Sequence, residues 1–308
     1  AKKNINGVCF EIKSNSCIIE DLEINNFSVA IKWDEKQQIN INRCHLYQNR
    51  IGILCKNAYI NTISNNYLTF NSVGIVAISQ SFQLLIINNV IDNNISYQKK
   101  GGVGILLSGS TGCEIRSNTI EGNRNLENGI GCGIYITGVC SSLNIIGNWF
   151  EVNYEKEKIN TKYAVDIYCS NDIKAENDSF QTNLINALFH KELIDVAKGT
   201  AYGSINIRDN CHVKTPHGII FSYFNYGRIS ISGETFTGDS SFNNKPILIR
   251  SSGNNYYNTV INVSDIREQN TSGNTSITNK RMTSGKDGKL LFMDDNFSHT
   301  GILEINYN

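Results

Sequence analysis

Apolar and polar positions recur along the middle of the chain at intervals of about 22 residues, which is typical of stacked repeats. Each block opens with an apolar residue, a glycine and an isoleucine. Farther along come an Ile, an Asn, a large apolar residue and a second Asn, always at similar spacing. Such units cannot bury an apolar face alone, so we expect them to stack. The four clearest blocks open with Ile51-Gly52-Ile53, Val73-Gly74-Ile75, Val103-Gly104-Ile105 and Cys132-Gly133-Ile134.

Each block contains three short apolar segments in which alternate residues are apolar, such as Leu143-Asn144-Ile145. Segments this short with period-two alternation indicate strands rather than helices. Three strands per block, each pairing with its equivalent one block later at about 4.8 Å, predict an all-β fold. We expect a right-handed, single-stranded parallel β-helix of about ten rungs. The recurring Asn side chains should bond the backbone of each bend and the amide of the next rung.

Composition agrees with this fold. The chain has 308 residues, of which 44 are Asn, 25 are Gly and only 2 are Pro. Proline cannot donate to a ladder, and almost every strand of a β-helix is central. The net charge of zero gives no reason to expect nucleic acid or an anionic membrane as a partner. No apolar run reaches membrane-spanning length, so we expect no membrane insertion. The first residue is not Met and no signal-peptide pattern follows, so we expect a fragment of a longer chain.

The repeat suggests two parts. We expect residues 1–270 to form the β-helix domain and residues 271–308 a C-terminal cap or assembly segment, because the open end of a solenoid must be covered. Within the first part, Tyr163–Asn183 and the stretch from Leu193 to Asn210 are interpreted as two irregular rungs. Within the second, Leu290–Met293 and Ile302–Ile305 are expected to form a final strand pair.

The nine cysteines are an odd number, and several fall at core positions of the repeat. We expect small apolar fillers with reduced thiols, which indicates folding in a cytoplasm. No Cys or His cluster has zinc-binding spacing, and no phosphate-binding or dinucleotide-binding motif is present. The sequence therefore predicts neither a metal nor a cofactor.

From Asn94 onward, successive rungs gain an insertion just after the second Asn, where the third strand leads to the next first strand. Insertions at one corner of consecutive rungs would wall one side of the cylinder, which is usually the binding face of a repeat protein. The alternative is that they are tolerated decoration. The four predicted insertions are Ile95–Gly102, Arg124–Gly131, Tyr154–Tyr163 and Leu184–Glu192.

One outward column combines acidic residues from successive rungs. Neighbouring members would lie about 5 Å apart and alternate members about 10 Å. Like charges this close should raise one pKa and provide an acid and a base together. Trp149 lies on the same face as Glu151 and would serve as a platform for a sugar ring. Ordinary solvated acidic residues remain the alternative. The column consists of Tyr47, Thr69, Asp92, Glu121, Glu151 and Gln181.

A second column on the first strand places Asp166 and Asp195 side by side, with Tyr135 one rung before them. Two neighbouring carboxylates have the spacing that glycoside hydrolysis needs, with either a nucleophile or an activated water. The catalytic candidates are therefore Glu121, Glu151, Asp166 and Asp195. Tyrosine and basic side chains would add stacking and hydrogen bonds to a polyhydroxylated polymer. The substrate-binding candidates are Asp92, Tyr135, Trp149, Tyr154, Tyr163, Tyr168 and Arg124.

The repeat across about residues 7–270 resembles the pectate-lyase-like right-handed β-helix superfamily, and within it the bacteriophage tailspike proteins. This resemblance implies a homotrimeric virion protein of the phage tail, folded in the host cytoplasm, that binds and cleaves capsule or O-antigen polysaccharide. It implies an endo-glycosidase with paired carboxylates, at the positions of Asp166, Asp195, Glu121 and Glu151. The chain departs from the polygalacturonases, because its one Asp-Asp pair, Asp294-Asp295, lies outside the rungs.

Two other functions stay open on the same fold. A polysaccharide lyase would use Tyr135 or Tyr168 as the base, with a Lys or Arg that neutralises a uronate carboxylate. A receptor-binding spike or adhesin would bind the polymer without cleaving it. The products formed from a purified polysaccharide distinguish the three.

Overall fold

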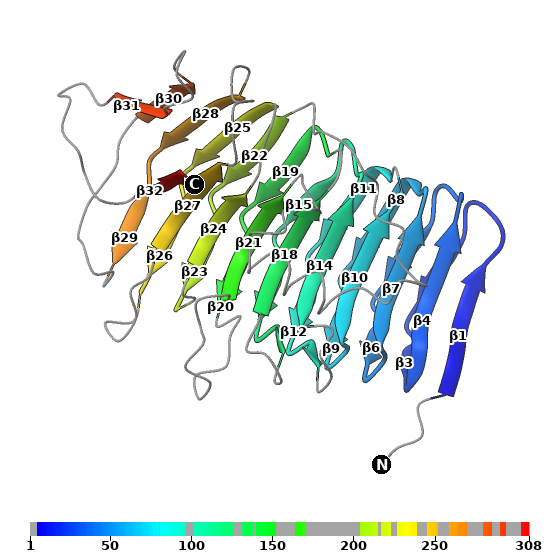
Figure 1. Ribbon diagram of the computed structural model, residues 1–308. Helices are drawn as coiled ribbons and strands as arrows, with labels where there is room; N and C mark the ends of the chain where they lie inside the picture. Colours follow the sequence, from blue (N-terminus) through cyan, green and yellow to red (C-terminus); the bar gives the residue numbers. More distant parts are fainter. Residues whose placement is uncertain are drawn as a thin grey trace.

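Three parallel sheets run the length of the molecule (Figure 1). The computed structural model describes most of the first 151 residues and shorter stretches thereafter. No helix among the residues it describes is long and apolar enough to cross a membrane. The described ranges are 5–79, 81–96, 102–125, 131–137, 140–151, 164–170, 204–214, 217–222, 227–238, 245–251, 259–269, 280–284, 290–293 and 303–307.

The three sheets are named A, B and C here, in the order in which each turn of the chain visits them. Sheet A consists of β1 (Ile5–Ile12), β4 (Phe27–Asp34), β7 (Ile51–Lys56), β10 (Val73–Ile78), β14 (Val103–Ser108), β18 (Gly131–Thr137), β21 (Ala164–Ser170), β24 (His217–Ser222), β27 (Lys245–Ser251) and β32 (Leu303–Tyr307). Sheet B consists of β2 (Ile18–Glu20), β5 (Asn40–Asn42), β8 (Tyr59–Ser64), β11 (Phe82–Ile87), β15 (Glu114–Arg116), β19 (Leu143–Ile146), β22 (Ser204–Arg208), β25 (Gly227–Ser232), β28 (Thr259–Ser264), β30 (Lys280–Ser284) and β31 (Leu290–Met293).

Sheet C consists of β3 (Glu23–Asn25), β6 (His45–Tyr47), β9 (Tyr67–Thr69), β12 (Val90–Asp92), β16 (Thr119–Glu121), β20 (Trp149–Glu151), β23 (Cys211–Val213), β26 (Thr235–Thr237) and β29 (Arg267–Gln269). A separate two-stranded sheet joins β13 (Ile95–Ser96) to β17 (Arg124–Asn125). Its strands follow β12 and β16 in the chain.

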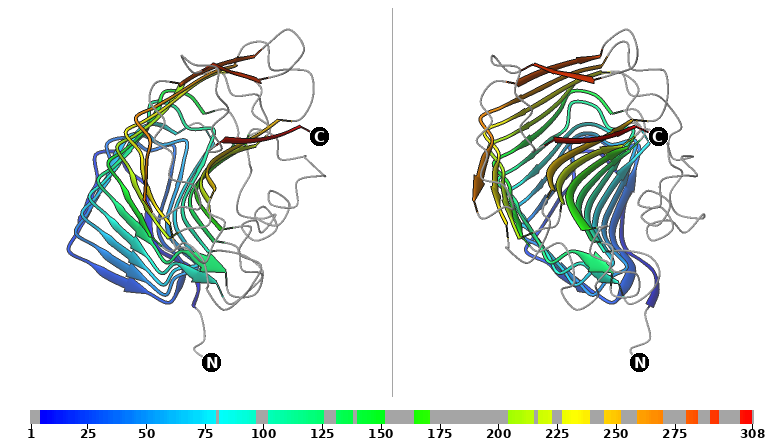
Figure 2. Two further views of the ribbon diagram at one scale, coloured as in Figure 1. Left: turned by 90° about the vertical axis from the view of Figure 1, so that its left-hand side faces the viewer. Right: turned by 60° about the vertical axis from the view of Figure 1, so that its left-hand side comes forward.

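Successive turns lie over one another (Figure 2), and each strand pairs in parallel with its equivalent in the next turn. The described residues form nine complete turns, one for each strand of sheet C, and β32 adds a tenth strand to sheet A. The predicted fold class, an all-β right-handed parallel β-helix, is therefore confirmed.

The seventh turn differs from the prediction. β21 pairs directly with β24, and β20 pairs directly with β23, so no further turn lies between these strands. The chain leaves sheet A at the end of β21 and re-enters the stack at β22, which pairs with β19. The interpretation of Tyr163–Asn183 and of Leu193 to Asn210 as two rungs is therefore wrong. Residues 171–203, between β21 and β22, lie outside the described part.

Each corner between sheets B and C is turned by a single residue in the left-handed backbone region. Small polar residues and glycine occupy most of these positions, because they adopt positive φ at little cost. The backbone N–H of this residue donates to a carbonyl of the next turn, as Asn65 does to Ile87 at 3.2 Å, so the ladder continues around the bend. The nine residues are Asp21, Arg43, Asn65, Asn88, Ser117, Gly147, Asp209, Gly233 and Asp265.

The predicted asparagine ladders are present on the inside of two corners. Asn118 shows the pattern: its Oδ1 accepts from the backbone N of Asn89 at 2.9 Å, and its Nδ2 donates to the carbonyl of Ile86 at 2.9 Å. The same Nδ2 donates to Oδ1 of Asn148, in the next turn, at 3.0 Å. Buried bends thus keep their backbone groups paired. One ladder runs through Asn66, Asn89, Asn118, Asn148 and Asn210, and the other through Asn49, Asn71, Asn94 and Asn123.

Replacing Asn118 with alanine should lower the free energy of unfolding by about 3 kcal/mol, because two buried backbone groups lose their partners. Urea denaturation followed by circular dichroism measures this change. Asn144→Ala is the matched control: Asn144 is half-exposed on the outer face of sheet B, and its side chain accepts one bond, from Asn206. The control should change stability by less than about 0.5 kcal/mol. Equal effects at the two positions would contradict a structural role for the ladder.

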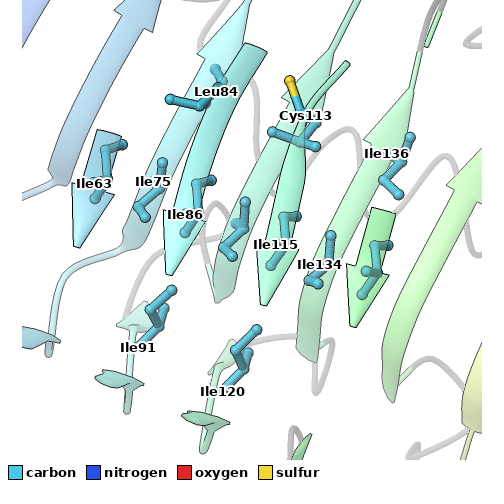
Figure 3. Packing of buried hydrophobic residues seen from close by; sticks show 14 of the residues in the cluster. Ile63, Ile75, Leu84, Ile86, Ile91, Cys113, Ile115, Ile120, Ile134 and Ile136 are labelled. Carbon is cyan, nitrogen blue, oxygen red and sulfur yellow. The ribbon is translucent and has the colours of Figure 1, made fainter. Parts of the chain in front are cut away.

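The interior is filled by stacked aliphatic side chains, mainly isoleucine (Figure 3). Glycine recurs at the start of the sheet A strands, where the backbones of adjacent turns approach closely. A Cβ on Gly104 would lie 2.7 Å from the carbonyl oxygen of Gly133. Six of the nine cysteines are buried and all nine carry free thiols, and Cys44 takes an Asn-ladder position as expected.

The last described strands depart from the repeat. β30 pairs with β28 in antiparallel orientation, and β31 pairs with β30 in the same way, while β32 extends sheet A in parallel from β27. The expected pairing of Leu290–Met293 with Ile302–Ile305 is therefore wrong, because these strands belong to different sheets. The division into a domain of residues 1–270 and a segment of residues 271–308 stays a prediction.

Candidate functional site

The outer face of sheet C brings three carboxylates together. Asp92 on β12 pairs with Glu121 on β16, which pairs with Glu151 on β20. Thr69 and Tyr47 continue the column toward the N-terminus, in the register expected from the repeat. On the other side the next residue is Val213 rather than the expected Gln181, because β20 pairs with β23. The three acidic side chains therefore occupy adjacent strands, about 4.8 Å apart.

All three carboxylates are partly shielded from solvent, and this shifts the pKa of two of them. Burial raises the pKa of Glu121, and the neighbouring charges of Asp92 and Glu151 raise it further. Burial also raises the pKa of Asp92, while hydrogen bonds from Asn93 and the charge of Arg124 oppose that shift. Glu121 is thus the central member of the row, with a carboxylate on each side that favours its protonated form.

Trp149 lies beside this row. Its indole Nε1 donates to Oε2 of Glu151 at 3.2 Å, and the side chain is 44% exposed. The two residues belong to the same strand and point to the same side, as β-strand geometry requires for residues two apart. An exposed indole next to a carboxylate offers a flat apolar surface on which a sugar ring can stack.

An aromatic group on β6 and β9 extends the same face toward the N-terminus. The ring of His45 stacks on that of Tyr47 with centroids 4.6 Å apart, and it meets the edge of Tyr67 at 6.2 Å. Tyr67 is 55% exposed. The hydroxyl of Tyr47 donates to Glu23 at 2.6 Å. Tyr47 was expected in the column, but the aromatic group was not, although the equal spacing of His45 and Tyr67 from the Asn residues indicates it.

The insertions that begin at Ile95 and Arg124 start at one corner, as predicted. The prediction that the insertion 184–192 shares this corner is wrong, because residues 171–203 connect β21 of sheet A to β22 of sheet B. Ile95 pairs with Arg124 in the small sheet of β13 and β17, so the first residues of two insertions stack. Arg124 is half-buried there and its charge acts on Asp92. Residues 97–101 and 126–130 of these insertions lie outside the described part. So do the insertions 154–163 and 184–192, together with the candidate residues Tyr154, Tyr163 and Asp195.

The expectation that Asp166 faces the substrate is wrong. Asp166 does not belong to an outward-facing column. It occupies the glycine position of sheet A, beside Gly133, and its side chain is completely buried inside the solenoid. Its Oδ2 accepts a hydrogen bond from Nδ1 of His212 at 2.9 Å. The expected Asp166–Asp195 neighbour pair is also wrong, because sheet A passes directly from β21 to β24. A polymer outside the solenoid cannot reach Asp166.

Tyr135 and Tyr168 are also buried rather than available to a substrate. They pair across β18 and β21, their rings stack with centroids 5.3 Å apart, and both are fully shielded from solvent. They belong to an apolar cluster on the outer face of sheet A that includes Leu54, Val76 and Leu106. Tyr168, and not Asp166, follows Tyr135 in this column.

Among the described residues, no three or more His, Cys, Asp or Glu side chains are arranged so that they could hold a metal ion. The outer face of sheet C instead offers neighbouring carboxylates, two of them with raised pKa values, flanked by exposed aromatic rings. Neighbouring acid and base groups of this kind are the equipment of general acid–base chemistry on glycosidic bonds.

Comparison with known proteins agrees with the architecture. A family model described as the right-handed β-helix region matches residues 6–180, more than half of the chain. No curated protein and no solved structure matches. Domains of this kind often bind or process carbohydrate. From the three stacked parallel sheets and this match, the chain belongs to the right-handed β-helix family.

Proposed function

We propose that this protein binds and cleaves a polysaccharide as an endo-acting glycoside hydrolase, at the outer face of sheet C. The observation that carries the proposal is the register of Asp92, Glu121 and Glu151 on three adjacent strands. A row of carboxylates one strand apart is suited to a reaction that needs one protonated and one ionised carboxyl group.

Glu121 is assigned the general acid. Burial and the flanking carboxylates favour its protonated form, which can donate a proton to the oxygen of the leaving sugar. Glu151 is assigned the nucleophile or base, and Trp149 holds it through the bond from Nε1 to Oε2. Water attack then completes the hydrolysis.

The spacing of the row bears on the stereochemical course. Glu121 and Glu151 lie on adjacent strands, about 5 Å apart, which suits retention through a covalent intermediate. Asp92 and Glu151 lie two strands apart, about 10 Å at the backbone, which leaves room for a water and suits inversion. Our assignment of Glu121 and Glu151 therefore corresponds to the retaining course.

The polymer is proposed to lie across the strands, along the axis of the stack. Tyr67 and Trp149 occupy the same outward column on β9 and β20, three strands apart, which corresponds to about 14 Å. Exposed rings at this separation would hold sugar units on either side of Asp92 and Glu121, whose strands lie between β9 and β20. The acidic face favours a neutral or only weakly charged polymer over a polyanion.

The resemblance to tailspike proteins supports a bacterial capsule or O-antigen polysaccharide as the substrate. It likewise supports a homotrimer on a phage virion, folded in the host cytoplasm. These remain predictions, as does a groove walled by the insertions 95–102, 124–131 and 154–163, which all follow strands of sheet C. The lyase alternative loses its two proposed bases, because Tyr135 and Tyr168 are buried.

Product analysis on purified capsule or O-antigen tests the proposal. Hydrolysis produces new reducing ends without ultraviolet absorbance, and polymer size falls quickly because cleavage is internal. Absorbance of an unsaturated uronate would instead identify a lyase. Binding with unchanged polymer size would identify an adhesin, and either result would overturn the proposed hydrolase.

Replacing Asp92 with asparagine should move the alkaline limb of the pH–rate profile to lower pH. Glu121 acts in its protonated form, so activity falls as pH rises through its raised pKa. The charge of Asp92 is one cause of that raised pKa, and its removal lowers the value. Initial cleavage rates across the acidic and neutral range measure the limb. A limb that stays in place, or moves to higher pH, would contradict the role of Glu121 as the acid.

A further inference from the structure

Three ionisable side chains meet inside the solenoid, where the repeat otherwise places apolar or amide groups. Asp166 occupies a position that is glycine in the four turns before it. His212 occupies the inward position of sheet C that is Phe150 in the turn before and Phe236 in the turn after. Glu234 occupies the ladder position that is Asn210 one turn earlier. Three departures from three different columns therefore converge on one place, and we call Asp166, His212 and Glu234 the buried triad.

Both ring nitrogens of His212 face a carboxylate. Nδ1 lies 2.9 Å from Oδ2 of Asp166, and Nε2 lies 2.8 Å from Oε2 of Glu234. His212 is 3% exposed and both acids are fully buried. A neutral imidazole has only one N–H, whereas two hydrogen bonds to ionised carboxylates require two. The geometry therefore fits an imidazolium between two acids.

The surroundings of the imidazole shield it from water. Its ring stacks on Phe150 with centroids 5.0 Å apart and planes within 4°, and on Phe236 at 4.5 Å and 13°. The face of an aromatic ring attracts a cation, more strongly where water is excluded. His212 is thus enclosed by a phenyl ring on each face and a carboxylate at each edge.

The groups in and around the triad come from five strands and two corners. Asp166 comes from β21 and Glu234 from the corner after β25, while β20 and β26 contribute the two phenyl rings. Asn210, at the corner before β23, donates from its backbone N and its Nδ2 to Oε1 of Glu234. The charge of Asp166 contributes to the raised pKa of two nearby thiols, Cys132 on β18 and Cys211 on β23.

The triad lies at the interrupted turn. Asp166 belongs to the last strand before residues 171–203, and His212 belongs to the second strand after them. In an ordinary turn the chain passes from sheet A to sheet B in a few residues, as from Lys56 at the end of β7 to Tyr59 at the start of β8. Between β21 and β22 this short connection between sheets A and B, which holds the two strands in register, is replaced by residues 171–203. Charged contacts buried at such a place specify one alignment, because any other leaves a charge unpaired.

We propose that the buried triad is a clasp that holds β21 in register with the turns after the interruption, and that it opens when His212 loses its proton. Deprotonation turns one ring nitrogen into an acceptor that faces a carboxylate, and it removes the positive charge that lies between Asp166 and Glu234. Because each turn of a solenoid contacts mainly its neighbours, the turns from β22 onward can loosen while the first turns stay folded.

The sign of the pH dependence follows from His212. Burial alone lowers the pKa of His212, but its bonds to Asp166 and Glu234 more than offset this and raise the pKa from 6.5 to about 9. The stability that the proton contributes is complete below pH 6.5 and is lost as pH rises toward about 9. Burial raises the pKa of Glu234, so its own contribution to stability is also lost as pH rises above 4.5.

Restoring the repeat at all three positions tests the clasp. The variant Asp166→Gly/His212→Phe/Glu234→Asn places in each column the residue that neighbouring turns carry. The folding equilibrium constant of the natural chain, from urea denaturation, should fall by up to about tenfold per pH unit between pH 6.5 and 9. The triple variant should show no such fall up to pH 8.5. Buried thiols destabilise both proteins above about pH 8.5, so the difference between the two isolates the buried triad.

Hydrogen exchange, corrected for the intrinsic rate at each pH, locates the opening. Amides of residues 204–237 should lose protection as pH rises, and those of residues 51–91 should keep it. Equal alkaline losses in the natural chain and the triple variant would overturn the clasp, as would loss of protection throughout. If the triple variant does not fold, Glu234→Gln replaces it. The loss for this variant should be complete at a lower pH, and an unchanged profile would overturn the proposal.

Discussion

Replacing Glu121 with glutamine should reduce the rate of polysaccharide cleavage by about 10²–10⁴-fold, the range associated with a general acid. Glutamine keeps the size of the side chain but has no proton to donate to the leaving oxygen. Glu121 lies half-buried on the surface of sheet C, so the fold and the binding of polymer should be unaffected. Reducing-end assays under saturating substrate measure the rate, and a binding assay on the intact polymer measures affinity.

The matched control for this change is Glu114→Gln. Glu114 begins β15 on sheet B, in the same turn as Glu121, and pairs with Arg116 at 2.6 Å. This variant should keep the activity of the natural chain. The companion variant Glu151→Gln should lose activity to a similar extent as Glu121→Gln, because hydrolysis needs both carboxyl groups. If both of these variants cleave at the full rate, the catalytic site lies elsewhere.

Replacing His212 alone with phenylalanine should lower the free energy of unfolding at pH 7 by about 3–5 kcal/mol, because two buried carboxylates lose the cation that lies between them. Phenylalanine fits the column, since Phe150 and Phe236 occupy the positions on either side. The loss would therefore come from charge rather than shape. Urea denaturation at pH 7 measures it.

Adding Asp166→Gly and Glu234→Asn to the same chain should restore stability to within about 1 kcal/mol of the natural protein, because buried ion pairs contribute little compared with a well-packed replacement. This recovery identifies the charges as the cause of the loss. A single variant as stable as the natural chain would show that His212 is not charged inside the solenoid.

The regular turns were predictable from the sequence for a physical reason. Each Asn of a ladder bonds the backbone of the turn before it, so the spacing from one Asn to the next determines which residues lie over one another. Asp92, Glu121 and Glu151 each fall at the same distance from such an Asn. Their register followed from counting residues, and the structure has the same register.

The seventh turn could not be predicted in the same way, because residues of the repeat motif are replaced in it. Aspartate stands at the glycine position of the opening motif, so Tyr163-Ala164-Val165 was aligned with the motif instead of Val165-Asp166-Ile167. This shift of two residues in the alignment placed Asp166 on the outer face of sheet A, at the position that Tyr168 occupies beside Tyr135. Leu193–Val196 has the apolar character of a strand, and nothing local distinguishes it from one.

Side-chain contacts between residues far apart in the chain could not be predicted from the sequence either. Asp166, His212 and Glu234 come from three columns, and only the folded stack shows that these columns meet. The burial of Tyr135 and Tyr168 had a similar cause. Alternation assigns them correctly to the outer face of sheet A, but it cannot show that this face is itself covered.

The side-chain amide dipoles of the ladder that begins at Asn66 all point the same way along the solenoid axis. Every side-chain amide from Asn66 to Asn210 donates toward the C-terminal end, and the last acceptor is the carboxylate of Glu234. Five bonds thus align their dipoles over about 24 Å, with the positive end at an anion. Polarisation along such a chain strengthens each bond. Substituting a ladder Asn near the middle of the solenoid would therefore change the electrostatic environment of Glu234 several turns away.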